Sequence, residues 1–137
     1  MKKAVIYARF RGNVNESAQS TETQIKRCTE YAQEKGYSIV NTYVDLTLNG
    51  AADTGEARQQ MFADAEREEW DTIIITTSDR LTRNIVEFYK MREKVHILTV
   101  GMDEETESNL IRNLLLGYSH YFAGKDKKEA DKRWKQQ

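Results

Sequence analysis

Residues 72–77 read TIIITT, and this stretch decides the fold class of the chain. All six residues are β-branched, and the apolar centre is typical of a strand buried on both faces in the middle of a sheet. Residues 78–81 then form a tight loop, and Thr82 can cap a helix that we expect to end near residue 93. A buried strand followed at once by a helix is typical of an α/β sheet.

The remaining sequence alternates in the same way. Strands are predicted over residues 3–9, 37–44 and 95–100, and helices over residues 21–35, 56–69 and 104–137. Strands separated by helices pair in parallel through right-handed crossovers. The chain is therefore predicted to have an α/β fold, with a central, mostly parallel sheet of about four strands and a long C-terminal helix. We expect residues 1–103 to form the α/β part and residues 104–137 the helix of the same domain.

Local signals fix the ends of the first helix. Residues 11–20 show no apolar periodicity and are predicted to be a loop. Thr21 and Gln24 have the spacing of a capping box, which predicts that the helix begins there. Gly36 is predicted to end it in the left-handed conformation.

Composition limits the class of protein. The chain has 137 residues, of which 39% are hydrophobic, with no proline, and this excludes a disordered or collagenous protein. No apolar run approaches the roughly 20 residues of a membrane span, and a single cysteine suits a reducing compartment, so we expect a cytoplasmic protein. Cys28, His96 and His120 lack metal-ligand spacing, and no cofactor is predicted.

Charged side chains follow the predicted strands and are expected to meet, because the carboxyl ends of parallel strands lie at one edge of a sheet. The expected cluster consists of Arg9, Arg80 and Arg83, with Arg58 from the second helix as a fourth member. Arg80 and Arg83 are three residues apart at the predicted opening of a helix, so we expect them to share a face. A guanidinium group can donate two parallel hydrogen bonds to phosphate oxygens, and it stays charged. The cluster therefore predicts a phosphodiester site that needs no metal.

Asp79 lies beside these arginines, and two interpretations remain open. Its carboxylate can orient an arginine or transfer a proton during a reaction. Alternatively, it only forms an ion pair with Arg9 or Arg80.

Three groups of residues resemble the resolvase/invertase family of serine recombinases. They are Tyr7-Ala8-Arg9-Phe10 with Thr23-Gln24, Tyr43-Val44-Asp45 with Gly50 and Arg58, and Ser78-Asp79-Arg80-Leu81-Thr82-Arg83-Asn84. The resemblance covers roughly residues 3–125, and the spacing from Arg9 to Gln24 is more similar to the large serine integrases. It implies a parallel sheet and a long helix that dimerises across DNA, and a reaction in which a serine hydroxyl cuts DNA through a phosphoserine link. It also implies that Arg9, Arg80 and Arg83 hold the scissile phosphate, that Arg58 assists and that Asp79 organises the cluster.

One position departs from the family pattern, which places a serine two residues after Arg9. Arg11 stands there, and a guanidinium has no nucleophilic oxygen. Ser17 and Ser20 lie further along and are the only candidate substitutes that we consider. We therefore weigh a recombinase catalytic domain that has lost its nucleophile against a non-enzymatic relative that binds DNA or protein. A nucleotide-binding module is less favoured, because no glycine-rich phosphate loop is present.

The C-terminal region suggests partners. The predicted helix carries a broad apolar face, consisting of Leu110, Ile111, Leu114, Leu115, Tyr118, Tyr121 and Phe122. A helix of this length is about 50 Å long, which is more than the sheet can cover, so we expect a homodimer or higher oligomer. Residues 125–137 hold six Lys or Arg and three Asp or Glu, which is either a solvated helix end or a basic arm for phosphates. The family resemblance also implies a DNA-reading module after this helix; none occurs before Gln137, so the chain is either a fragment or a short relative that acts through partners.

Overall fold

The computed structural model describes residues 2–50, 52, 54–67 and 69–125. The chain divides into two compact units, residues 1–104 and residues 105–137, which are described separately below. The first unit holds the sheet and its helices. The second consists, in its described part, of most of one helix.

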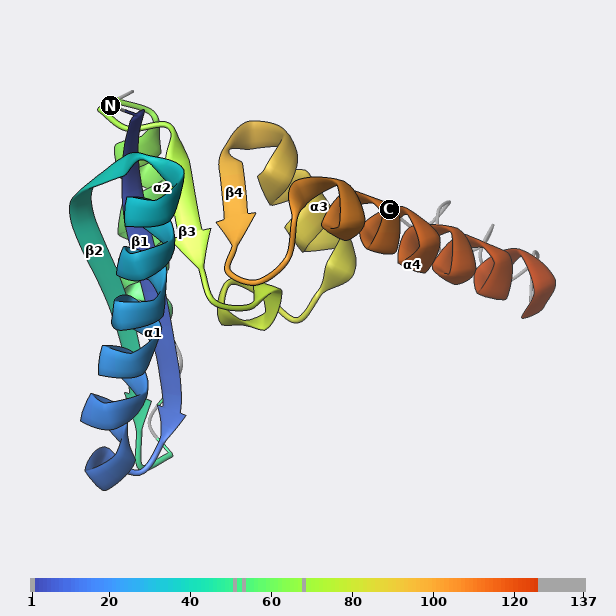
Figure 1. The fold of residues 1–137 in the computed structure, drawn as a ribbon. Helices are drawn as coiled ribbons and strands as arrows, with labels where there is room; N and C mark the ends of the chain where they lie inside the picture. Colours follow the sequence, from blue (N-terminus) through green and yellow to red (C-terminus); the bar gives the residue numbers. More distant parts are fainter. Residues whose placement is uncertain (1, 51, 53, 68, 126–137) are drawn as a thin grey trace. The chain divides into compact units, whose positions relative to one another are not determined.

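Four parallel strands form the sheet, in the order β2-β1-β3-β4. The elements along the chain are β1 (Lys2–Gly12), α1 (Val14–Lys35), β2 (Tyr37–Leu48), α2 (Glu56–Ala65), β3 (Thr72–Ile75), the 3-10 turn η1 (Ser78–Arg80), α3 (Ile85–Lys94), β4 (His96–Thr99) and α4 (Glu104–Lys125). Figure 1 shows the strands running in one direction, with α1 along β1 and β2 on one face of the sheet. The predicted α/β class, parallel sheet and C-terminal helix are confirmed.

β1 and β2 are much longer than the other two strands. They pair along their whole length, from Lys2 and Tyr37 to Gly12 and Leu48, with one register shift between Ala4 and Val5. β1 pairs with β3 only from Ala4 to Ile6. The second half of β1 therefore has a strand neighbour on one side only, and its other edge is open to side chains.

The core lies between the sheet and α1. Ala4, Ile6, Cys28, Ala32, Ile74 and Leu98 form one buried cluster. The Cys28 thiol donates to the Ile74 carbonyl over 3.8 Å, and burial raises its pKa to about 12. Cys28 is thus a packing residue whose thiol stays protonated near neutral pH.

Two predicted boundaries of α1 gave opposite outcomes. The loop predicted over residues 11–20 and the cap predicted at Thr21 are wrong: β1 continues to Gly12, Asn13 is the N-cap, and α1 begins at Val14. The first turns of α1 are exposed, so they need no apolar periodicity and look like a loop in the sequence. Gly36 ends the helix as predicted, with φ of 80° and its N–H directed at the Ala32 and Gln33 carbonyls.

Other boundaries also moved. β2 runs on to Leu48, four residues beyond the end of the strand predicted over residues 37–44. The predicted helix cap at Thr82 is wrong, because α3 begins at Ile85 and the Asn84 side chain accepts from the backbone N–H groups of Val86 and Glu87. Both Thr and Asn are good caps, and the sequence alone does not choose between them.

α4 is described as a helix from Glu104 to Lys125. Part of the predicted helix and nearly all of the basic segment lie at residues 126–137, outside the described residues, as do the side chains of His120, Tyr121 and Phe122. None of the described helices is long and apolar enough to cross a membrane.

Candidate functional site

A cavity of about 440 Å³ lies where β1 ends and η1 begins. Five arginines line this space, which is called the arginine cavity below: Arg9, Arg11, Arg58, Arg80 and Arg83. Its walls also include Asp79, which is its one acidic residue, and Ser20. The structure thus brings together every predicted site residue except Ser17, whose side chain is outside the description. Their roles in DNA binding or cleavage stay predictions.

On the edge that faces away from β2, the backbone of Arg9 is held by side chains instead of by a strand. Its N–H donates to the Gln24 Oε1 over 3.0 Å, and its carbonyl accepts from the Gln24 Nε2 over 2.9 Å. The same carbonyl accepts from the Arg80 Nη1 over 3.1 Å. Gln24 is only 4% exposed, so its amide occupies the open edge of β1 as the backbone of another strand would.

The Gln24 amide also reaches the cavity wall. Its Nε2 donates to the Ser20 hydroxyl over 3.2 Å, one helical turn earlier in α1. Sequence reasoning assigned Gln24 to a capping box and missed this role. The four-residue spacing from Ser20 to Gln24 places both side chains on one face of a helix. This spacing is informative only if the helix begins before Thr21, and the predicted helix begins at Thr21.

Asp45 fixes the start of α2. Its carboxylate accepts from the backbone N–H groups of Ala57 over 2.8 Å and Arg58 over 3.0 Å. It also accepts from the Tyr7 hydroxyl over 2.6 Å. Burial, and then this hydrogen bond to a carboxylate, raise the pKa of Tyr7 well above its usual value. Asp45, a residue of β2, therefore connects β1 to the first turn of α2, which carries Arg58.

The Arg58 side chain is fixed at its far end as well. Its Nη1 donates to the Leu81 carbonyl over 2.6 Å and lies 3.6 Å from the Glu87 Oε1. Arg58 thus connects α2 to the turn after η1 and to α3. Glu87 was not singled out from the sequence, since no motif marks a lone acidic residue in the first turn of a helix.

Arg80 and Arg83 reach the arginine cavity by a route other than the predicted one. Arg80 is the last residue of η1 and Arg83 precedes α3, so they do not share the face of one helix, and that prediction is wrong. The chain turns between them, and both still line the cavity. The Asp79 carboxylate accepts a hydrogen bond from the Thr77 hydroxyl.

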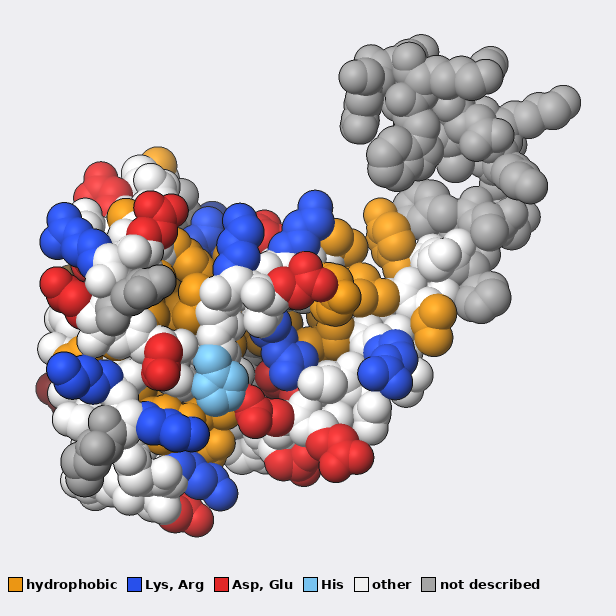
Figure 2. Space-filling view, turned by 90° about the horizontal axis from the view of Figure 1, so that it is seen from above, with side chains coloured by type: hydrophobic (Ala, Val, Ile, Leu, Met, Phe, Trp, Pro, Cys, Tyr) orange, Lys and Arg blue, Asp and Glu red, His pale blue; other side chains and the backbone are white. Residues whose placement is uncertain are grey.

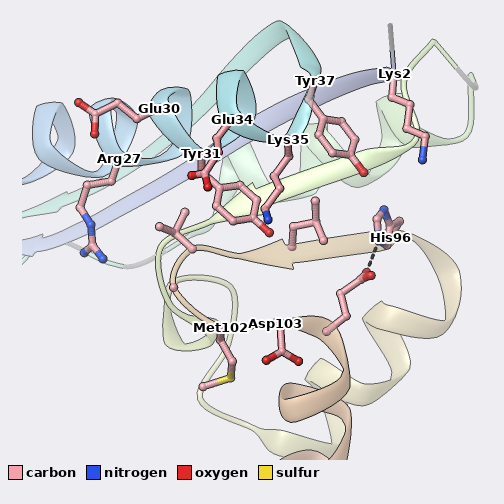
Figure 3. Close-up of a pocket in the computed structure, with 14 residues that line it drawn as sticks. Lys2, Arg27, Glu30, Tyr31, Glu34, Lys35, Tyr37, His96, Met102 and Asp103 are labelled. Carbon is pink, nitrogen blue, oxygen red and sulfur yellow. Dashed lines mark hydrogen bonds and ion pairs between the residues drawn. The ribbon is translucent and has the colours of Figure 1, made fainter.

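A larger cavity, of about 760 Å³, lies elsewhere in the same unit and includes none of the predicted site residues. Figure 3 shows Tyr31, Tyr37 and Met102 around it, with the His96 imidazole bonded to a neighbouring carboxylate, which is that of Glu104. His96 also contacts the Thr72 hydroxyl over 3.0 Å. Figure 2 looks onto the end of the sheet where the strands begin, and there basic and acidic side chains of the first unit are interspersed. The concentration of arginines is a property of the opposite end of the sheet.

Comparison with known proteins gives consistent matches. The family described as "Resolvase, N terminal domain" matches residues 4–135. The N-terminal catalytic domain of TP901-1 integrase is similar at 25% identity and a TM-score of 0.67, over 89% of this chain and 96% of that one. The C-terminal catalytic domain of ISC1926 TnpA, an IS607-like serine recombinase, is 31% identical over 79% of this chain and 77% of that one, with a TM-score of 0.61.

A resolvase family site-specific recombinase from Streptococcus pneumoniae shares the fold, with a TM-score of 0.70 at 17% identity, over 100% of both chains. A search of curated proteins gave no match. The resemblance inferred from the motifs is confirmed.

Proposed function

Because this chain belongs to the resolvase family of serine recombinases, we propose that its arginine cavity binds the phosphodiester backbone of DNA without cutting it. The observation that carries the proposal is the gathering of five arginines and one carboxylate around a single cavity. Such an excess of fixed positive charge suits a phosphate, whose oxygens accept paired hydrogen bonds from guanidinium groups. The proposal assigns phosphate contacts to Arg9, Arg80 and Arg83, and a supporting position to Arg58.

Cleavage needs a nucleophile as well as a phosphate site. Arg11 occupies the position where the family pattern has a serine, and its guanidinium supplies charge but no hydroxyl. Ser20 lines the cavity, but its hydroxyl already accepts a hydrogen bond from Gln24. A nucleophile must lie in line with the bond that breaks, and Ser20 stands nine positions further along the chain, on α1 instead of β1. The proposal is therefore a domain that binds DNA and does not form a phosphoserine.

A covalent-adduct assay tests this directly. The protein is incubated with a nicked suicide DNA substrate, on which a cleaving recombinase would be trapped, and the products are separated under denaturing conditions. We expect no adduct, and we expect none from Ser20→Ala or Ser17→Ala. An adduct mapped to Ser20 or Ser17 by mass spectrometry would overturn the assignment.

We also expect that Arg11→Ser alone does not restore full recombination. Full recombination activity of that variant would contradict this prediction.

A second candidate function is that of a regulatory relative that acts through oligomerisation, in the cytoplasm and on DNA. The observation that favours it is the set of large apolar side chains exposed on α4, which are Leu110, Leu114, Leu116 and Tyr118. Exposed apolar surface on this scale is typical of an interaction site. One protein can both bind DNA and self-associate, so the two candidate functions are compatible. The sedimentation experiment in the Discussion tests whether the protein self-associates.

A further inference from the structure

A third cavity, of about 480 Å³, adjoins the arginine cavity. Phe10, Ser20 and Arg80 line both, so the two spaces share a wall at the end of β1. This space lies against α1 and is called the α1 cavity below. It contains one basic residue that the motifs do not mark, Arg27, which follows Ser20 by about two helical turns.

Two residues that line the α1 cavity each carry a buried polar atom with no hydrogen-bond partner among the residues that the structure describes. These atoms are the Thr76 hydroxyl and the Arg80 Nε. Thr76 is only 4% exposed and stands directly after β3. Unpartnered buried polar groups are rare in native proteins, and a ligand that supplies the missing partner is one explanation for them. An acceptor is the partner that the Arg80 Nε requires, and a hydroxyl can donate to the same acceptor.

The charges around the cavity suggest the chemistry of that acceptor. Arg27 and Arg80 contribute two guanidinium groups, and Glu16 contributes the one carboxylate. Arg27 also lines the cavity of about 760 Å³ that Figure 3 shows, so its side chain stands between that space and the α1 cavity. The Gln19 amide and the Thr77 hydroxyl complete a wall that is rich in hydrogen-bonding groups. This composition suits a phosphate better than an apolar group or a cation.

We infer that the α1 cavity binds a second phosphate of DNA, next to the one in the arginine cavity, with Arg27 as its principal cation. The inference rests on the proposed function. A DNA strand carries one phosphate per 3.4 Å of helix axis, so a strand held in one cavity presents its next phosphate close by. Arg80 borders both cavities and lies between the two positions. Arg27 and Thr76 then become DNA-contacting residues, and Glu16 limits the affinity.

The salt dependence of DNA binding counts phosphate contacts. The probe is a 16-base-pair duplex of mixed sequence, and binding is measured at several salt concentrations with the intact chain. Each lost contact reduces the slope of log K against log salt by roughly 0.9. We expect Arg27→Gln to reduce the slope by about that amount. Lys26→Gln is the matched control, since it removes the same charge from the neighbouring residue of α1, which is exposed. Equal slopes for these two variants would overturn the inference.

The same experiment separates this inference from the proposed function. Arg83→Gln removes an arginine of the arginine cavity alone. A wild-type slope near zero, or a slope that Arg83→Gln leaves unchanged, contradicts the proposed function. A slope that responds to Arg83→Gln and not to Arg27→Gln contradicts only the second phosphate.

Thr76→Val supplies an independent test that does not involve charge. Valine has nearly the same shape and removes a hydroxyl for which the described part of the chain supplies no partner, so we expect the melting temperature to stay the same or to rise. DNA affinity is expected to fall about threefold or more, since a hydrogen bond to a charged group is lost. A stable Thr76→Val variant that binds DNA as tightly as the wild type would overturn the contact.

Glu16→Gln removes the carboxylate that lines the α1 cavity, so this variant is expected to bind DNA more tightly than the wild type. A loss of DNA affinity would contradict the assignment of a negatively charged ligand to this cavity.

Discussion

Gln24 holds Arg9 in place through its backbone, so the geometry of the arginine cavity depends on an amide that need not touch DNA. Gln24→Ala leaves the N–H and the carbonyl of Arg9 without this partner on the open edge of β1. We expect a loss of about 1–3 kcal/mol in the free energy of unfolding, measured by urea denaturation. DNA affinity should fall as well. Gln33→Ala is the control, because Gln33 is exposed on the same helix, and an equal loss in both variants would contradict this role.

Cys28 gives a pH-dependent prediction. Its folded pKa of about 12 lies above its ordinary value of 9.0. A raised pKa means that its contribution to stability is complete below pH 9 and is lost as the pH rises towards 12. We expect the free energy of unfolding to fall by about 1.4 kcal/mol per pH unit above pH 9. Urea denaturation between pH 8 and pH 10 checks this, and Cys28→Ala should remove that part of the decline. Rapid labelling of the native thiol at pH 8 would show that it is not buried.

Arg9, Arg80 and Arg83 could be predicted together because they lie at or just after the ends of predicted strands, and parallel strands end at one edge. Asp45 follows a predicted strand as well, but the contacts of Asp45, Glu87 and Gln24 could not be predicted in this way. Their partners are backbone groups of Ala57, Arg58 and Arg9 and the side chain of Arg58, which lie far away in the sequence. Such contacts depend on tertiary distances that no local pattern encodes.

At the scale of elements, the buried strands were the easiest to identify and the polar helix ends the hardest. β3 is β-branched and buried throughout, so its signal is local. The start of α1 is polar and exposed, and the turn from η1 to α3 contains two good capping residues, so local signals conflict there. The same conflict explains why Arg80 and Arg83 were placed on one helix.

The cap of α3 offers a direct test at this scale. Asn84→Ala removes an oxygen that accepts from the N–H groups of Val86 and Glu87, and we expect a cost of about 1 kcal/mol in unfolding free energy. Asn84→Asp keeps the acceptor and should restore most of the stability. Thr82→Ala should cost less than Asn84→Ala, since the Thr82 hydroxyl accepts from one backbone N–H within the described chain, that of Asn84. The reverse order in thermal or urea denaturation would indicate that Thr82 is the effective cap.

For the whole molecule, the open question is association through α4. We expect wild-type protein to sediment as a dimer or larger species, and Leu110→Lys with Leu114→Lys to shift it towards a 16.0 kDa monomer. Charge at an apolar interface is costly, because it must be desolvated without a partner. Sedimentation velocity measures the shift, and circular dichroism confirms that the helix content is retained. A wild-type protein that is already monomeric at all concentrations would exclude self-association.

The unequal lengths of β1 and β3 have a consequence for motion. Val5 lies where β1 has strands on both sides, whereas Arg9 relies on two side chains for one of its edges. Side chains can release a backbone group by rotating, without separating any pair of strands. The region around Arg9 can therefore open locally while the sheet stays folded. We expect the Arg9 amide to exchange with deuterium through such local openings, and the Val5 amide to exchange only through global unfolding. A domain with this arrangement can open locally to release a ligand and close again with a small change in free energy.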